Sequence, residues 1–172
     1  MKKNSINLSL VAVTLIALAA ATRFLPHPAN FTAIGAIALF GTARMNDKRI
    51  GFLLPIAAMI ISDLFLPGGF NISVYASFVL ISLLGMSLRN TNKALPVLGA
   101  SIASSLIFYI VTNWAVWFFG NGTFYPETIN GLWMSYTAAV PFFLNGLAGD
   151  LFFNSAIFGT YAIASKQLAI AK

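Results

Sequence analysis

Two aspartates interrupt long apolar runs of this chain and are the first candidates for chemistry. Asp63 and Asp150 each follow such a run, and each begins the tripeptide Asp-Leu-Phe. An ionisable group inside a bilayer costs about 2.5–3.5 kcal/mol, so it faces protein or water and is a functional candidate by default. Two carboxylates, one protonated and one ionised, could also act as an acid–base pair. The structural alternative is a hydrogen bond between helices.

A second polar group is the segment 23–32, which holds the single histidine of the chain. Arg23 could pair with either aspartate, or meet an anionic group of a ligand. The prolines on both sides of His27 hold it in an extended or turn conformation, suited to a pocket cover or to a solvated turn. Asn30 is a candidate N-cap for the helix that follows.

Aromatic and amide side chains form a third group. Asn113 and Trp117 belong to one apolar run, and Tyr125 follows in a polar segment. The Asn113 amide could orient a ligand, while Trp117 and Tyr125 could stack on a planar one. An aromatic belt at a membrane surface is the alternative reading.

Composition sets the environment of these residues. Of the 172 residues, 59% are hydrophobic and only 8% are charged, far below the roughly 25% of soluble domains. The apolar runs predict an all-α, polytopic membrane protein, because backbone groups in lipid must be satisfied within helices or a closed barrel. The net charge of +6 comes from scattered Lys and Arg, so we expect no nucleic acid partner. The lack of cysteine and the single histidine argue against a metal site.

One integral membrane domain over residues 1–172 is expected. The first helix has a secretory signal as its alternative, because a basic start precedes a short apolar core and small residues. An amphipathic piece near 130–138 either leads into the sixth helix or belongs to it. The predicted transmembrane helices are about 8–22, 31–43, 50–66, 72–88, 95–119 and 141–165.

The distribution of cations supports this count. With both termini cytoplasmic, nine of the ten Lys and Arg fall on the cytoplasmic side, and only Arg23 falls outside. Merging two helices would break that alternation. The six-helix topology then places Asp63, Asn113 and Asp150 in the outer half of the bundle, near the loop of Arg23, His27 and Asn30. Four separate segments therefore bring hydrogen-bonding groups to one layer.

Several motifs carry a resemblance over nearly the whole chain. They are Arg23-x-Leu-Pro-His-Pro-x-Asn-Phe-Thr-x-x-Gly-Ala, Ser62-Asp63-Leu64, Val111-Thr-Asn-Trp-x-Val-Trp117 and Gly149-Asp150-Leu151. The sequence resembles an uncharacterised family of small bacterial membrane proteins, which in turn is similar to the S components of energy-coupling-factor (ECF) vitamin transporters. That resemblance implies a six-transmembrane-helix bundle in the bacterial inner (cytoplasmic) membrane.

The resemblance also implies a function. S components capture a vitamin or its precursor from the outer side and deliver it with a coupling protein and two ATPases. Ala17 and Ala21 match the Ala-x-x-x-Ala face that contacts the coupling protein in that family. The chain has no phosphate-binding loop of the type G-x-x-x-x-G-K, so any ATP use would lie in a partner. We expect no catalysis and no cofactor; a membrane assembly protein, or an enzyme using Asp63 and Asp150, are the alternatives.

Overall fold

The computed structural model describes residues 2–66, 69–91 and 93–170, and over them the chain forms six α-helices and no strand. The all-α prediction with six helices is confirmed. The helices are α1 (Lys2–Ala21), α2 (Ile34–Arg44), α3 (Lys48–Asp63), α4 (Ile72–Met86), α5 (Ala94–Phe119) and α6 (Ile129–Ile170), with a 3-10 turn η1 (Thr22–Phe24) after α1.

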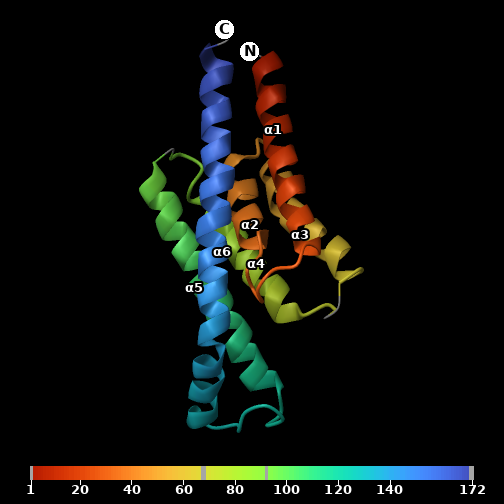
Figure 1. The fold of residues 1–172 in the computed structure, drawn as a ribbon, viewed down its shortest axis with the longest axis vertical. Helices are drawn as coiled ribbons and strands as arrows, with labels where there is room; N and C mark the ends of the chain where they lie inside the picture. Colours follow the sequence, from red (N-terminus) through yellow and green to blue (C-terminus); the bar gives the residue numbers. More distant parts are fainter. Residues whose placement is uncertain (1, 67–68, 92, 171–172) are drawn as a thin grey trace.

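The helices alternate in direction along one axis (Figure 1). The start of α1 and the end of α6 lie at the same end of the molecule, which we call the termini end. The connection between α5 and α6 lies at the opposite end, the hairpin end, where these two helices project beyond the others. By length and composition, α5 and α6 are the two described helices that could cross a membrane, and α6 alone spans about 63 Å at about 1.5 Å per residue.

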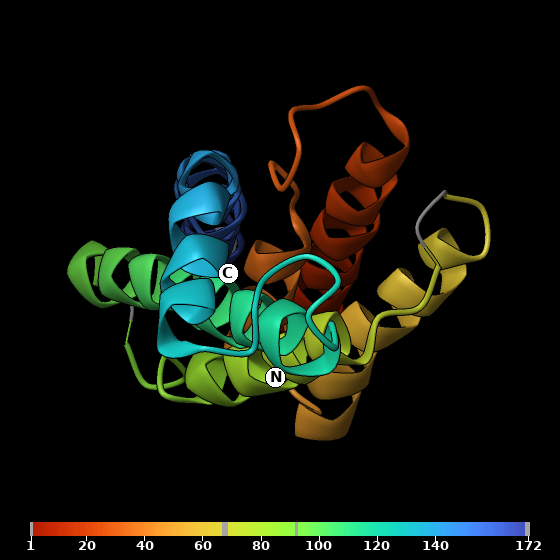
Figure 2. The ribbon, with the colours of Figure 1, turned by 90° about the horizontal axis from the view of Figure 1, so that it is seen from below.

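Helix α2 is the centre of the bundle. It packs against all five other helices, and each of its residues from Ile34 to Ala43 is buried. Viewed from the hairpin end (Figure 2), the segment after α1 arches away from the bundle and returns to its middle, where α2 begins. A helix that is apolar on every side is stable only when it is buried. The short second helix that the sequence predicts is therefore enclosed by protein.

Glycines allow the neighbours of α2 to approach closely. A Cβ atom on Gly41 would lie 2.6 Å from the backbone oxygen of Gly51 in α3. A Cβ atom on Gly85 of α4 would lie 2.6 Å from the backbone oxygen of Leu39. Such small-residue contacts let backbones pack together where no side chain fits.

Polar caps set the helix ends. The Asp47 carboxylate accepts hydrogen bonds from the backbone N–H groups of Arg49 and Ile50 at the start of α3. At the end of α2, the Arg89 guanidinium donates to the Thr42 carbonyl (2.7 Å), and Arg44 donates to the Leu88 carbonyl (2.8 Å). Arginine donors on terminal carbonyls satisfy groups that the helix itself leaves unpaired.

Three helix starts differ from the sequence prediction. Helix α1 begins at Lys2, not near residue 8. Asn30 is not an N-cap: α2 begins at Ile34 after Ala33, and Asn30 has a left-handed backbone (φ 65°), which asparagine tolerates better than most residues. The sixth helix begins at Ile129, not near Pro141, so the amphipathic piece belongs to it. Contacts with α5 hold this extension, because the Ser135 hydroxyl donates to the Asn113 carbonyl (2.9 Å) and Tyr136 donates to the Ile110 carbonyl (3.0 Å).

Candidate functional site

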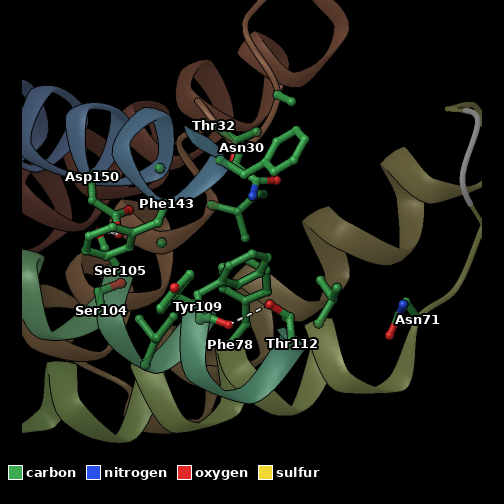
Figure 3. Close-up of a pocket in the computed structure, with 18 of the residues that line it drawn as sticks. Asn30, Thr32, Asn71, Phe78, Ser104, Ser105, Tyr109, Thr112, Phe143 and Asp150 are labelled. Atoms are coloured by element: carbon green, nitrogen blue, oxygen red, sulfur yellow. Dashed lines mark hydrogen bonds between the residues drawn. The ribbon is translucent and has the colours of Figure 1, made fainter. Parts of the chain in front are cut away.

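A cavity of about 510 Å³ lies on the hairpin side of α2. Its walls come from the segment around Arg23 and Asn30 and from α2 to α6. Exposed residues, Asn30 and Asn71, form one end, which we call the mouth; buried residues, Ser104, Ser105 and Asp150, form the other, the closed end. Figure 3 shows Asp150 and Asn71 at opposite ends of the lining. A pocket of this size fits a small organic molecule.

The turn before α2 shapes the mouth. The Phe31 N–H donates to the Pro28 carbonyl (3.0 Å), and the Thr32 N–H donates to the Asn30 carbonyl (3.0 Å). The left-handed backbone of Asn30 makes this reversal possible. The turn therefore places Asn30 and Thr32 in the cavity wall (Figure 3).

Asp63 is held by a polar network beside the mouth. Its Oδ1 lies 2.9 Å from Nη1 of Arg23, and its Oδ2 accepts a hydrogen bond from the Tyr75 hydroxyl (2.7 Å). Nη1 of Arg23 also donates to the Ser62 hydroxyl. Of the two aspartates that Arg23 could pair with, the structure thus gives it Asp63. The positive charge of Arg23 and the negative charge of Asp63 therefore neutralise each other.

Asp150 at the closed end has a different environment. Only 7% of the residue is exposed, and its Oδ2 accepts a hydrogen bond from the Ser105 hydroxyl (2.7 Å). No salt bridge to it occurs among the described residues. The Ser104 hydroxyl nearby is fully buried without a hydrogen-bond partner in that part of the chain. A Cβ atom on Gly35 would overlap the Asp150 carboxylate, so α2 must carry glycine at that point.

Aromatic rings line the wall between the two ends. The rings of Tyr109 and Phe143 lie 4.9 Å apart between centroids, and those of Phe78 and Phe108 lie 5.4 Å apart. The Tyr109 hydroxyl donates to the Tyr136 carbonyl (2.7 Å), which fixes its ring. This wall offers flat apolar surfaces to a ligand, and the polar groups that could orient it stand at both ends.

Five of the eight residues that the sequence predicts for the site line this cavity: Arg23, Asn30, Asp63, Asn113 and Asp150. The structure thus brings together side chains from four separate segments. Asn113 lies in the wall with its amide donating to the Tyr109 carbonyl (2.8 Å).

The other three predicted residues lie outside the cavity lining as the described residues define it. His27 is exposed, and its Nδ1 lies 3.0 Å from the Pro28 carbonyl oxygen. Trp117 donates through Nε1 to the Pro126 carbonyl (3.0 Å) near the hairpin end, and Tyr125 lies half-buried in the adjacent loop. A role for them in ligand binding stays a prediction.

Sequence reasoning missed part of the lining. Thr32, Ser104, Ser105 and Thr112 were not predicted, nor were the rings of Tyr109 and Phe143. The signal for the serines was present, because Ser101, Ser104 and Ser105 are polar residues on one face of an apolar helix. The signal for the rings was absent, since Phe and Tyr occur throughout the chain.

A second, apolar groove of about 390 Å³ lies between α1 and α3. Its lining includes Ala17 and Ala21, the pair that the sequence predicts for partner binding, together with Ala57 and Ala58. Ala17 and Ala21 are both exposed. The predicted pair is therefore accessible from outside the bundle.

Comparison with known proteins gives a family. The chain belongs to the family described as Family of unknown function (DUF6580), whose model matches residues 3–171. A search of the curated proteins and a search of the solved structures found no match.

Proposed function

We propose that this DUF6580 protein is the membrane-embedded substrate-binding component of an uptake transporter for a vitamin or another small metabolite, similar to ECF S components. It would cross the inner membrane six times, with both termini cytoplasmic. The cavity would receive the ligand from the outer side. A separate coupling protein with ATPases would supply the energy, with the groove at Ala17 and Ala21 as a candidate contact.

The outward faces of the helices support a membrane location. Large apolar side chains are exposed on every helix around α2, among them Leu18, Leu53, Leu83, Ile110 and Phe152. A soluble monomer rarely exposes large apolar side chains on so many of its helices, whereas lipid would cover them. Because α1, α3 and α4 also expose large apolar side chains, the exposure supports a membrane location for these shorter helices as well.

The position of charges supports the orientation. Arg44, Arg49, Arg89 and Lys93 flank the helix connections at the termini end, and Arg23 lies on the side of the cavity mouth. Cations concentrate on the cytoplasmic side of membrane proteins. The mouth would then face outward.

The single observation that carries the binding function is a cavity of about 510 Å³ whose lining runs from exposed residues at the mouth to buried polar residues at the closed end. An assembly protein without a ligand needs no such space. An enzyme using Asp63 and Asp150 is less favoured, because Asp63 is engaged by Arg23 and Tyr75 while Asp150 bonds to Ser105. Neither carboxylate has the other as its hydrogen-bond partner.

Retention of a native ligand tests this function. The protein is purified from its natural membrane, denatured and analysed by mass spectrometry for a released small molecule, and thermal unfolding is followed across a panel of vitamins. We expect one retained compound, or a raised unfolding temperature with one compound. No released molecule together with no thermal shift would contradict the proposal.

A matched pair of variants ties the result to the cavity. A Cβ atom on Gly146 would meet its nearest neighbour at 3.6 Å, so Gly146→Leu fills the cavity without a backbone clash. Gly159 on the same helix has nothing within 4 Å of its added Cβ and is exposed, so Gly159→Leu is the control. Ligand should be lost in Gly146→Leu and kept in Gly159→Leu.

Topology is tested with single cysteines, since the natural chain has none. Thr123 in the α5–α6 loop and Asn90 in the α4–α5 loop are both exposed. In intact spheroplasts a membrane-impermeant maleimide should label Thr123→Cys, and it should label Asn90→Cys only after permeabilisation. Labelling of both positions without permeabilisation would refute the six-span topology.

A further inference from the structure

The closed end of the cavity holds a carboxylate that the described part of the protein does not neutralise. Only 7% of Asp150 is exposed, and its polar neighbours are neutral: the Ser105 hydroxyl donates a hydrogen bond to it, and the Ser104 hydroxyl lies close by. Arg23 is the cation of the cavity lining, and it is already engaged by Asp63 and Ser62. A buried carboxylate without a partner is costly, so the Asp150 carboxyl group is held either protonated or next to a positive group, and a cationic ligand would supply that group.

Charge counting across the lining leads to the same requirement. Arg23 and Asp63 cancel each other, which leaves Asp150 as the acidic group of the described lining that has no cation beside it. An anionic ligand would add a second negative charge inside a poorly solvated space. A ligand with one positive charge would bring the sum to zero.

The surroundings of Asp150 also suit a cation. Phe143 and Asp150 line the same cavity from α6, and Tyr109 packs against Phe143. Aromatic faces attract an ammonium or guanidinium group. The Ser104 hydroxyl, fully buried in the same wall near the carboxylate, has oxygen lone pairs that can accept an N–H.

We propose that the ligand is an organic cation: a protonated amine or amidine on a flat apolar body. Its nitrogen would donate to Asp150 and Ser104 at the closed end. Its ring would lie against Phe143 and Tyr109, with any polar tail toward Asn30 and Asn71 at the mouth. This inference rests on the proposed binding function and names its ligand class.

Three indole probes of nearly equal size test the charge requirement. Tryptamine is a cation, tryptophol is neutral and indole-3-acetate is an anion at neutral pH. Binding of each to the full-length protein in nanodiscs is measured by isothermal titration calorimetry. We expect tryptamine to bind at least about 10-fold more tightly than tryptophol, as a charge-assisted hydrogen bond requires, and indole-3-acetate to bind weakest.

Asp150→Asn locates the effect, because asparagine keeps an oxygen that Ser105 can bond. We expect the preference for tryptamine over tryptophol to disappear in this variant. Glu127→Gln is the control, since it removes a carboxylate from an exposed loop residue outside the lining. It should keep the preference of the natural protein. If Asp150→Asn does not fold, the comparison of the three probes on the natural chain still decides.

The outcomes separate the two proposals. Tryptophol or indole-3-acetate binding as tightly as tryptamine would overturn the cationic ligand and leave the binding cavity intact. So would a preference for tryptamine that persists in Asp150→Asn. Binding by none of the three probes would overturn the cationic flat ligand; the binding function would fall only if mass spectrometry also found no retained compound.

Discussion

The two aspartates of the cavity share a local sequence but not an environment. Asp63 and Asp150 both begin Asp-Leu-Phe, and both line the same cavity. Asp63 near the mouth has a guanidinium at 2.9 Å and a phenol at 2.7 Å, whereas Asp150 at the closed end has only neutral serine hydroxyls among the described residues, with Ser105 at 2.7 Å. The same residue therefore serves as an internal ion pair in one place and remains available to a ligand in the other.

This difference predicts different contributions of the two carboxylates to stability. A carboxylate whose partners belong to the chain contributes to the stability of the mouth. A carboxylate without a cation of its own costs stability in the empty protein, and natural proteins retain such costs mainly at functional sites. The free energy of unfolding, measured in mixed micelles of dodecyl sulfate, should separate the two roles.

Breaking the ion pair at the mouth should have the largest effect. Arg23→Ala leaves Asp63 with Tyr75 as its partner. We expect the free energy of unfolding to fall by about 3 kcal/mol, the lower end of the range for breaking a buried ion pair. Lys93→Ala, an exposed residue at the termini end, is the control. The double variant Arg23→Ala/Asp63→Asn should recover part of the loss. A double variant as unstable as the sum of its single changes would show that the two residues do not interact.

The packing of α2 against the closed end should give the next effect. In Gly35→Ala the added Cβ overlaps the Asp150 carboxylate, and Ser104 Oγ lies only 3.1 Å from it. We expect about 2 kcal/mol of destabilisation from overpacking. Gly99→Ala on α5, where an added Cβ meets nothing within 4 Å, should be neutral or slightly stabilising. Equal stability of the two variants would mean that α2 and α6 can move apart freely.

The second partner of Asp63 should matter less than the first. Tyr75→Phe removes the hydroxyl that donates to Asp63 and keeps the ring that packs against Phe70. We expect the free energy of unfolding to fall by about 1.5 kcal/mol, as for the loss of a hydrogen bond to a charged group. Tyr125→Phe in the loop at the hairpin end is the control. A loss larger than that of Arg23→Ala would reverse the order of the two partners.

The charge at the closed end should contribute least to stability. Asp150→Asn keeps an acceptor for Ser105 and removes an uncompensated charge, so we expect a change within about 1 kcal/mol, of either sign. Asp63→Asn should be clearly destabilising by comparison, because it leaves Arg23 without its carboxylate. If the two substitutions lower the free energy of unfolding equally, the different environments of Asp63 and Asp150 do not give them different contributions to stability.

The helices could be predicted from the sequence because hydropathy is a local property. Helices α2 to α5, the expected short second helix included, agree with the predicted bounds to within about three residues, and α1 differs only in its earlier start at Lys2. The exception is the start of α6, where Pro141 and polar residues interrupt the apolar run. Hydrogen bonds from Ser135 and Tyr136 to α5 hold that segment helical, and such contacts between helices leave no local signal.

The candidate site was predictable in part for the same reason. Charged and amide side chains inside an apolar sequence are conspicuous, so Arg23, Asn30, Asp63, Asn113 and Asp150 could be chosen without coordinates. Rings such as Phe143 could not be chosen, since aromatic residues are common on every helix. His27, Trp117 and Tyr125 show the opposite case: conspicuous residue types that the fold places outside the lining.

The sequence by itself determined that the chain is a bundle of apolar helices with a few polar residues gathered in one layer. Only the tertiary structure decided that α2 is the enclosed helix, that Arg23 pairs with Asp63, and that Asp150 has no cation beside it among the described residues. The physical reason is that the composition and spacing of the sequence show which polar residues lie within apolar helices. Pairing depends on distances of a few ångströms between segments far apart in the chain.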